Sequence, residues 1–366
     1  MSHIRDIELR MIGLPLVRPF RTSFGEETRK ECILVRVVTD EAIGWGECVA
    51  GRRPDYSEEY NEEAWLSLRD HLGPVLLGGD VKPEDVARRT AWARGHRMAK
   101  AALEMAVLDA WLREQGVSLA THLGAVRDRV ECGVSIGIAP TTQELLDQVD
   151  GYLAEGYRRI KLKIEPGTDV ERVAAVRGAH PDIALSVDAN AAYTIEQTEL
   201  LRALEPFDLL MIEQPLSHED LEEHAKLQRV LRTPICLDES IRSAADAAAA
   251  LELGSCRILN VKPGRVGGLL EGRRIHDLAL AQDVPVWCGG MLETGVGRAA
   301  NLALAALAGF TLPGDTSASH RYFAADVTEP FVLAADGTMA VPDGPGLGVV
   351  PTDERLEEIT TRVERI

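Results

Sequence analysis

Five segments between residues 159 and 262 share one pattern, a short apolar run that ends on a charged side chain. They read Arg159-Ile-Lys-Leu-Lys163, Ala184-Leu-Ser-Val-Asp188, Leu209-Leu-Met-Ile-Glu213, Pro234-Ile-Cys-Leu-Asp238 and Arg257-Ile-Leu-Asn-Val-Lys262. Successive charged ends lie 24 or 25 positions apart, which is the length of one strand–helix unit. Because helical patterns fill the intervals, the segments predict parallel β/α units.

Further apolar runs extend the series on both sides. They span residues 132–137, 285–289 and, more weakly, 310–313. Eight units within about 190 residues fit a closed (β/α)8-type barrel better than an open sheet. In such a barrel the chemistry lies where the strands end and the following loops begin.

The residues outside this series predict a second, smaller domain. Strands are expected over 4–14 and 32–38, a mobile loop over 18–25, and helices over 57–77, 83–94 and 98–113. Residues after 320 hold no further barrel unit and include a Gly/Pro-rich run over 342–348. We therefore expect an N-terminal α+β capping domain (1–125), a barrel domain (126–320) and a C-terminal segment (321–366) that returns to the cap.

Composition narrows the class of protein. The 366 residues include 40 Lys and Arg against 58 Asp and Glu, for a formal charge of −18. Such an acidic chain is a poor partner for nucleic acids or anionic membranes. No apolar run approaches the ~18 residues of a membrane span, and the charged N-terminus does not resemble a secretory signal. The sequence therefore predicts a cytoplasmic protein that acts on a small molecule.

Three of the charged strand ends are carboxylates on neighbouring strands. Asp188, Glu213 and Asp238 should converge at the mouth of the barrel. Each could instead cap a strand or a helix, but nothing structural requires five such residues in register. Converging carboxylate oxygens suit Mg²⁺, with Mn²⁺ as a substitute. Zinc is disfavoured, because there is no His-Glu-x-x-His motif and the six cysteines do not cluster.

Two lysines end strands on opposite sides of the predicted barrel. Lys163 ends the second strand and Lys262 the sixth, so both can reach a ligand between them. Lys161 lies two residues before Lys163 and points to the same face. A metal that holds a substrate carboxylate next to two amines favours removal of a proton α to that carboxylate.

These residues resemble those of the enolase superfamily. The Lys-x-Lys pair with a lysine on the sixth strand resembles the muconate-lactonizing branch, whose fold is an enolase-like (β/α)7β barrel under an α+β cap. Several segments are similar to the o-succinylbenzoate synthase / N-succinylamino acid (N-acylamino acid) racemase family. They include Ile160-Lys-Leu-Lys-Ile-Glu-Pro-Gly167, Val187-Asp-Ala-Asn190, Ile212-Glu-Gln-Pro215, Cys236-Leu-Asp-Glu-Ser240, Asn260-Val-Lys-Pro-Gly-Arg-Val-Gly-Gly268 and Trp287-Cys-Gly-Gly-Met-Leu-Glu-Thr-Gly295.

The resemblance implies a role for each residue of the site. Asp188, Glu213 and Asp238 would bind Mg²⁺, and Lys163 and Lys262 would be the acid/base pair. The substrate pocket would be lined by Ser135, Lys161, Asn190, Arg265, Gly290 and Met291, where Arg265 matches an arginine typical of members that racemise. The family also implies a homo-oligomer, and cap segments around 18–24 and Tyr56 that close over the mouth.

The expected reaction is dehydration to 2-succinylbenzoate in menaquinone synthesis, racemisation of N-succinylamino acids, or both. A muconate-type cycloisomerase and a non-catalytic metal-binding scaffold remain alternatives. A scaffold has no need for two costly lysines at the mouth. Dipeptide epimerases of this branch carry Asp-x-Asp after the last strand, whereas Pro313-Gly-Asp-Thr-Ser317 offers only Asp315. This difference argues against a substrate with a free amine.

Overall fold

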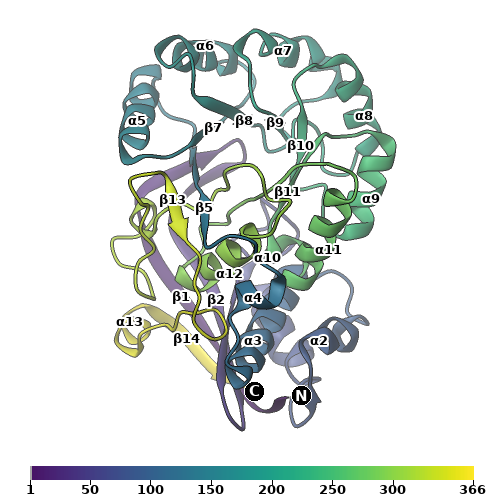
Figure 1. Ribbon diagram of the computed structural model, residues 1–366, viewed down its shortest axis with the longest axis vertical. Coiled ribbons are helices and arrows are strands. Elements are labelled where there is room, and N and C mark those ends of the chain that lie inside the picture. The colour runs from purple at the N-terminus through teal and green to yellow at the C-terminus, as the bar shows by residue number, and fades with distance from the viewer. Residues whose placement is uncertain (1) are drawn as a thin grey trace.

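A parallel barrel and a capping domain make up the computed structural model, which describes residues 2–366 (Figure 1). Seven parallel strands follow one another around the barrel in chain order. They are β6 (Gly133–Ile136), β7 (Arg159–Lys163), β8 (Ala184–Asp188), β9 (Ile212–Glu213), β10 (Ile235–Leu237), β11 (Ile258–Val261) and β12 (Val286–Cys288). The prediction of a parallel barrel is thus confirmed.

An irregular segment closes the barrel where the weak eighth run was predicted. Phe310 forms a parallel bridge with Val286 of β12, and Gly314 forms one with Cys132, just before β6. The amide of Gly133 also donates to the carbonyl of Gly314 (2.7 Å). The segment therefore joins the first and last strands without being a regular strand itself, which is the (β/α)7β arrangement.

Helices surround the barrel on its outer side. They are α5 (Thr142–Glu155), α6 (Asp169–Ala179), α7 (Thr198–Arg202), α8 (Leu221–Val230), α9 (Ala244–Leu253), α10 (Pro263–Val266), α11 (Leu269–Leu280) and α12 (Gly295–Ala305), with 3₁₀ turns at 195–197, 205–207 and 319–321. Side chains of Thr141, Asp220 and Ser243 accept from backbone amides in the first turns of α5, α8 and α9. These N-caps satisfy donors that would otherwise be unpaired, so they define where each helix begins.

The strand residues alternate between two environments. Ile160 and Leu162 of β7 belong to the apolar core between barrel and helices, whereas Lys161 and Lys163 belong to the inner face. Lower in the barrel, Met211, Cys236, Ile258 and Trp287 form a separate apolar cluster. The charged groups therefore lie above an apolar plug, at the ends of the strands.

The cap is built on an antiparallel sheet with strand order β14-β1-β2-β3. Its strands are β1 (Ser2–Thr22), β2 (Gly25–Thr39), β3 (Ile43–Cys48) and β14 (Thr360–Arg365), and β4 (Asp80–Val81) pairs with β1. Its helices are α1 (Asn61–Ser67), α2 (Pro83–Thr90), α3 (Arg97–Gln115), α4 (Leu119–Leu123) and α13 (Asp353–Ile359), with a π-helical turn over Leu68–Leu72. A small ribbon of β5 (Arg129–Glu131) and β13 (Thr338–Ala340) lies beside the barrel.

Helix α3 packs directly on β3 because two glycines remove the side chains between them. A Cβ atom on Gly44 would lie 2.1 Å from the carbonyl oxygen of Ala106, and one on Gly46 would lie 2.0 Å from that of Ala102. Alanines on the helix complete the close approach. This contact fixes the long helix against the cap sheet.

Two predicted elements of the cap differ in the structure. The predicted loop over 18–25 is the end of a β-hairpin, in which Phe20 pairs with Glu27 and Thr22 pairs with Gly25. Tertiary contacts hold it in place, because the amide of Ile138 donates to the carbonyl of Arg21 (2.9 Å). The helix predicted over 57–77 begins only at Asn61, since the residues before it form a loop.

Two buried glutamates of the cap bind the starts of barrel helices. Glu47 accepts from the backbone amides of Thr294 (3.1 Å) and Gly297 (2.9 Å) at α12. Glu104 accepts from the amide of Leu270 (3.0 Å) at α11, and burial raises the pKa of its carboxyl to about 7. The cap is thus joined to the barrel through helix N-termini.

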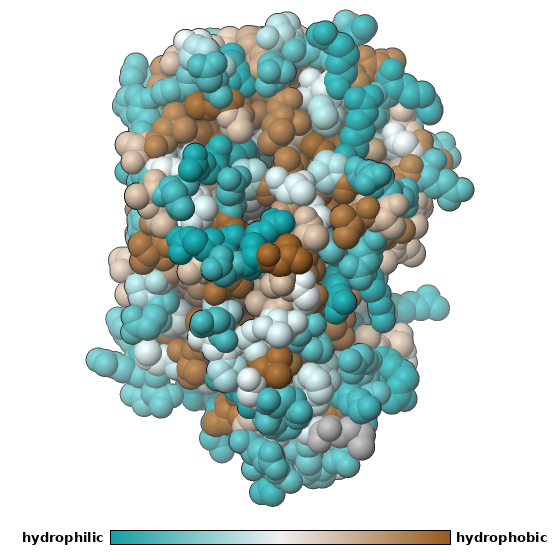
Figure 2. Space-filling view, viewed as in Figure 1, coloured by the Kyte–Doolittle hydropathy of each residue, from teal (hydrophilic) through white to brown (hydrophobic). Residues whose placement is uncertain are grey.

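The surface mixes hydrophilic and apolar side chains on the face seen in Figure 2. Along residues 2–366, no helix has the length and apolar character that crossing a membrane requires.

Candidate active site

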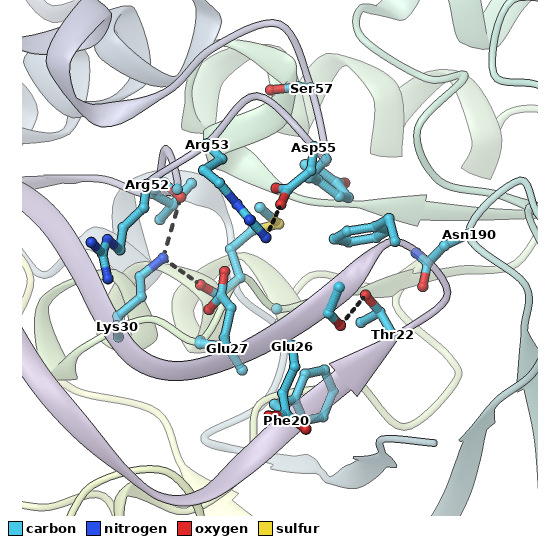
Figure 3. A pocket seen from close by; sticks show the side chains of 18 of the residues that line it. Phe20, Thr22, Glu26, Glu27, Lys30, Arg52, Arg53, Asp55, Ser57 and Asn190 are labelled. Atoms are coloured by element: carbon cyan, nitrogen blue, oxygen red, sulfur yellow. Dashed lines mark hydrogen bonds and ion pairs between the residues drawn. The ribbon is translucent and has the colours of Figure 1, made fainter. Parts of the chain in front are cut away.

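A cavity of about 430 Å³ lies between the cap and the mouth of the barrel. Part of its wall comes from the cap (Figure 3). Of the residues predicted for the substrate pocket, the cavity is lined by Ser135, Lys161, Asn190, Gly290 and Met291, together with Lys163 and Lys262. The cap adds Phe20, Thr22, Phe24 and Tyr56. The rings of the two phenylalanines and the tyrosine make this side of the cavity partly apolar.

The carboxylates lie on neighbouring strands in a staggered register. Lys163 pairs with Asp188, and Asp188 pairs with Glu213. Glu213 pairs with Cys236, so Asp238 lies two residues further along its own strand. Barrel strands tilt against the axis, and a two-residue advance keeps the side chain on the inner face at the height of the mouth.

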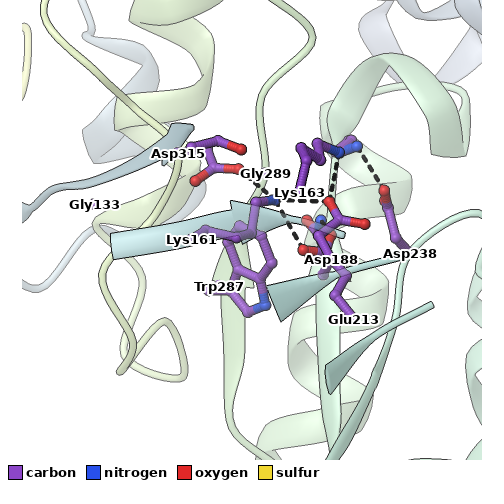
Figure 4. A network of polar contacts seen from close by, with 12 residues as sticks. Gly133, Lys161, Lys163, Asp188, Glu213, Asp238, Trp287, Gly289 and Asp315 are labelled. Atoms are coloured by element: carbon purple, nitrogen blue, oxygen red, sulfur yellow. Dashed lines mark hydrogen bonds and ion pairs between the residues drawn. The ribbon is translucent and has the colours of Figure 1, made fainter. Parts of the chain in front are cut away.

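Lys161 contacts three carboxylates at the floor of the cavity (Figure 4). Its Nζ atom lies 3.1 Å from Asp188, 2.8 Å from Glu213 and 2.7 Å from Asp315. Burial would lower the pKa of Lys161, but these three acids outweigh it and hold the pKa above its ordinary value. Lys161 is therefore a buried cation that holds the acidic groups together.

Lys163 lies above this network and is held by two barrel residues. Its Nζ atom donates to Asp188 Oδ2 and to Asn190 Oδ1, both at 2.6 Å. Asn190 in turn donates from Nδ2 to Glu239 (2.9 Å), an acid that the sequence analysis did not single out. Glu239 and Asn190 thus fix the direction of the lysine side chain.

Lys262 approaches the cavity from the opposite side of the barrel. Its Nζ atom lies 2.7 Å from Asp238 and 3.1 Å from the hydroxyl of Tyr56. Burial would lower the pKa of this lysine, but Tyr56 and nearby acids, Glu239 foremost, hold it above its usual value. Gly289 leaves room for the side chain, because a Cβ there would lie 2.6 Å from Lys262 Cε.

Arg265 differs from the other residues predicted for the pocket. It is buried beside Asp238 and is not among the described residues that line the cavity. Its guanidinium pairs with Asp238 and donates to the carbonyls of Ile241 (2.8 Å) and Asn260 (2.5 Å). The role of Arg265 in the substrate pocket therefore stays a prediction, and in this structure the side chain lies behind Asp238 and contacts that carboxylate.

Asp315 lies in the irregular segment that closes the barrel, and two cationic side chains of β7 bind its carboxylate. Arg159 donates to Asp315 Oδ1 (2.8 Å), and Lys161 binds the other oxygen. These cations hold the pKa of the Asp315 carboxyl below its ordinary range, although burial opposes them. Both oxygens of Asp315 therefore bind cationic side chains of the barrel.

The donor groups of the site fit a divalent metal. Asp188, Glu213 and Asp238 are all buried carboxylates at adjacent strand ends, and each already binds a cationic side chain. Lys161 bridges Asp188 and Glu213, so these two stabilise one shared cation. Within the described chain, however, no three or more His, Cys, Asp or Glu side chains lie close enough together to hold a metal ion. Lysine and arginine side chains contact these carboxylates in this structure.

Gln214 supports this arrangement from the neighbouring strand, and the sequence analysis did not identify it. Its side-chain oxygen accepts from the amides of Asp238 (3.0 Å) and Ser240 (3.2 Å), and its Nε2 donates to the Ser240 hydroxyl (2.8 Å). Its φ of 37° lies in the left-handed region, which is costly for a residue with a side chain. These buried hydrogen bonds offset the backbone strain at Gln214, and they position Asp238.

A capped barrel with carboxylates on three consecutive strands and lysines on both sides defines the class of the enolase superfamily. Residues 6–124 match the family model described as "Mandelate racemase / muconate lactonizing enzyme, N-terminal domain". Residues 144–355 match the model described as "Enolase C-terminal domain-like". The chain therefore belongs to the mandelate racemase / muconate lactonizing enzyme family of the enolase superfamily.

Curated relatives of high sequence identity place the chain in a narrower group within this family. The chain is 58% identical over 360 residues to an N-succinylamino acid racemase of Amycolatopsis, covering 98% of both chains. It is 51% identical over 360 residues to an o-succinylbenzoate synthase of Geobacillus stearothermophilus, covering 98% of this chain and 96% of that one. The predicted resemblance to this group is confirmed.

Solved structures of related proteins have the same fold as this chain. An enolase superfamily member from Listeria innocua has a TM-score of 0.96 and 42% identity, and covers 100% of this chain and 99% of its own. A dipeptide epimerase from Cytophaga hutchinsonii, complexed with Mg and the dipeptide D-Ala-L-Val, has a TM-score of 0.93 and 26% identity, with 100% of both chains covered. The fold of this chain is therefore one that holds Mg in a related enzyme.

Proposed function

We propose that this chain is a Mg²⁺-dependent enzyme that removes the proton α to a substrate carboxylate, as an o-succinylbenzoate synthase, an N-succinylamino acid racemase, or both. The observation that carries the proposal is the placement of Lys163 and Lys262, which line one cavity from opposite sides of the barrel. Two bases that face each other across one carbon are what racemisation needs.

The residues at the mouth of the barrel would have separate roles in the reaction. Asp188, Glu213 and Asp238 would hold the metal, which when bound supplies positive charge for the substrate carboxylate. In racemisation one lysine takes the α-proton as its C–H bond breaks, and the other delivers a proton to the opposite face. In dehydration Lys163 takes the α-proton and then returns it to the β-hydroxide as the C–O bond breaks, so that water leaves, while Lys262 would supply positive charge.

The charge balance at the mouth supports an anionic substrate. Five cationic and five anionic side chains form the network: Arg159, Lys161, Lys163, Lys262 and Arg265 against Asp188, Glu213, Asp238, Glu239 and Asp315. Because these charges already balance, a divalent cation adds an excess of two. A carboxylate substrate offsets part of that excess, so metal and substrate favour each other.

Removal of the metal tests the proposal. Protein dialysed against a chelator should lose α-proton exchange with N-succinylphenylalanine and dehydration of the hydroxy-carboxylate precursor of 2-succinylbenzoate, and Mg²⁺ or Mn²⁺ should restore them. Full turnover in metal-free buffer would contradict the assignment of the carboxylates. Absence of exchange with metal would favour the scaffold alternative, and turnover of cis,cis-muconate alone would favour the cycloisomerase.

Three further expectations are proposals of the same kind. The division of the chain at about residue 125 is supported by the family-model match that ends at residue 124, whereas the boundary at about residue 320 lies inside the second match, over 144–355. A homo-oligomeric state is carried over from the family, and light scattering during gel filtration measures it. Cytoplasmic residence is proposed from the acidic composition, and fractionation of the source cells tests it.

A further inference from the structure

The cap touches the catalytic machinery through Tyr56. This residue lies in the loop between β3 and α1, and its hydroxyl accepts a hydrogen bond from Lys262 Nζ (3.1 Å). The same hydroxyl lies 3.4 Å from Asp238 Oδ2. The ammonium also lies over the ring, 4.9 Å from its centroid. Lys262 is thus held between a barrel carboxylate and a cap phenol, each of which favours its charge.

The loop that carries Tyr56 is closed at its base. The amide of Asn61 donates to the carbonyl of Gly51 (2.8 Å), which joins the two ends of the loop. Beyond Tyr56, Glu59 accepts from the amides at the start of α3, including Met98 (2.9 Å). The intervening residues 52–55 are exposed. The loop is therefore anchored at both ends, and the Tyr56 side chain turns inward from its exposed tip.

Among residues 2–366, Lys163 has no equivalent hydrogen bond with the cap. Its hydrogen-bond partners, Asp188 and Asn190, both belong to the barrel, and Asn190 is held by a third barrel residue, Glu239. The described contacts therefore divide the two lysines between the domains. One is positioned by the barrel alone, and the other is shared between barrel and cap.

We propose that Tyr56 is a positioning residue for Lys262, so that the 51–60 loop of the cap governs proton transfer on the Lys262 face of the substrate and not on the Lys163 face. The proposal rests on the proposed function. When Lys262 acts as base, the C–H electron pair stays on the substrate and the proton joins the Nζ lone pair. The new ammonium then donates to Asp238 and to Tyr56. Without the phenol oxygen, Nζ turns toward Asp238 and away from the substrate.

A purely structural Tyr56 predicts a different result. If the ring served only as cavity wall, its loss would affect both enantiomers of a substrate alike. If the hydroxyl positions Lys262, only the enantiomer that presents its α-proton to Lys262 is affected. The asymmetry between enantiomers therefore separates the two roles, independently of overall activity or folding.

The experiment measures α-proton exchange into deuterium oxide by NMR, for each enantiomer of N-succinylphenylalanine with saturating Mg²⁺. Lys262→Ala identifies the enantiomer that depends on Lys262. Tyr56→Phe keeps the ring and should slow that exchange by ~10-fold or more, the size expected for one lost hydrogen bond to a charged group. Exchange of the other enantiomer should stay within about twofold, because its base, Lys163, keeps both partners.

Two matched variants complete the design. Asn190→Ala removes a partner of Lys163 and should therefore slow the enantiomer that depends on Lys163 more than the other. Phe24→Leu changes a ring that packs against Tyr56 without touching either lysine, and should change both enantiomers equally. Equal slowing of both enantiomers by Tyr56→Phe, or no slowing of either, would overturn the positioning role while the proposed function stands. If wild-type protein exchanges neither enantiomer, the proposed function is overturned, and the positioning role with it.

Discussion

Lys161 and Lys163 are separated by one residue but make different contacts in the site. Lys161 contacts three acids and lies over the Trp287 ring, 4.7 Å from its centroid. Lys163 lies one step higher, at the end of β7, and among the described residues its hydrogen bonds go to Asp188 and Asn190. Both side chains point inward, so their different depth decides which contacts each one makes, and under the proposed function it makes Lys163 the base and Lys161 a structural cation.

The two bases should be separable by mutation. Lys163→Ala should stop exchange of one N-succinylamino acid enantiomer, and Lys262→Ala should stop exchange of the other, each by ~100-fold or more. Either change should abolish racemisation. Lys262→Arg should retain part of the dehydration, because it keeps the positive charge. NMR exchange and coupled dehydration assays check this, with metal and ligand binding measured by calorimetry as the control. Loss of both exchanges in each variant would require a one-base mechanism.

The site residues that follow a regular spacing in the sequence were the ones that could be predicted. The spacing of strand ends in the sequence places Lys163, Asp188 and Glu213 in register, and the structure has this register. The resemblance named Tyr56 only as part of a cap segment near the mouth, and Gln214 follows a strand end, but the chain order does not show that Tyr56 contacts Lys262 or that Gln214 binds the Asp238 amide. Arg265 follows a strand end as well, but its direction is decided by tertiary contacts with Asp238 and Asn260.

At the level of elements, Glu104 shows how a helix of one domain stabilises the start of a helix in the other. It lies in the middle of α3, is fully buried, and accepts from the first turn of α11. A charged carboxylate suits a helix N-terminus, yet burial raises the pKa of this group to about 7. Its carboxyl therefore binds a proton more tightly in the folded protein than in the unfolded chain.

Replacement of Glu104 by Gln should change how stability depends on pH. Between pH 4.5 and about 7 the folded state holds a proton that the unfolded state has lost, so this group's contribution falls as pH rises. The free energy of unfolding of Glu104→Gln relative to wild type should therefore rise across that window, by roughly 2–3 kcal/mol at most. Urea unfolding at pH 5 and pH 8 measures it.

The matched control for this experiment is Glu252→Gln, at an exposed position near the end of α9. Its difference from wild type should be the same at both pH values. A flat difference for Glu104→Gln as well would show that the buried carboxyl has the same proton affinity in both states.

Elements were predicted well where local pattern and tertiary role coincide. The helix expected over 98–113 is α3, and the barrel runs are β6 to β12 within a few residues. The hairpin end at 18–25 was missed because its polar residues and Gly25 favour a loop locally, whereas pairing with the start of β2 holds the segment as a strand. The helix at 57–77 is shorter because Glu59 caps α3 and Asn61 donates to the carbonyl of Glu31 (3.1 Å).

At the scale of the whole molecule, cap and barrel are joined by buried polar contacts as well as apolar packing. Glu47 accepts from two amides and from the hydroxyl of Thr294 (2.7 Å) at α12. Lys30 donates to the carbonyls of Val49 (3.3 Å) in the cap and Met291 (2.9 Å) in the barrel. These contacts surround the cavity on the side of β12, so the shape of the cavity depends on the docking of the domains.

Replacement of Glu47 by Ala should weaken this docking. It leaves three buried donors without an acceptor, at about 1–3 kcal/mol for an unsatisfied group. We expect a loss of roughly 2–5 kcal/mol in the free energy of unfolding, and faster hydrogen exchange at residues 294–298. The exposed Glu171→Ala variant is the control and should change neither quantity. Unchanged exchange at α12 in Glu47→Ala would show that packing alone holds the domains together.

The pairing of β14 with β1 has a consequence for how the protein is made. Arg10 pairs with Val363, so 353 residues separate the two partners along the chain. At a synthesis rate of ~5–20 residues per second, β1 waits roughly 20–70 s for its neighbour. During that interval a long strand presents an open hydrogen-bonding edge inside the cell, which invites aggregation. Until translation reaches β14, cover of this edge by a chaperone or by the growing barrel would keep the first strand from pairing with other chains.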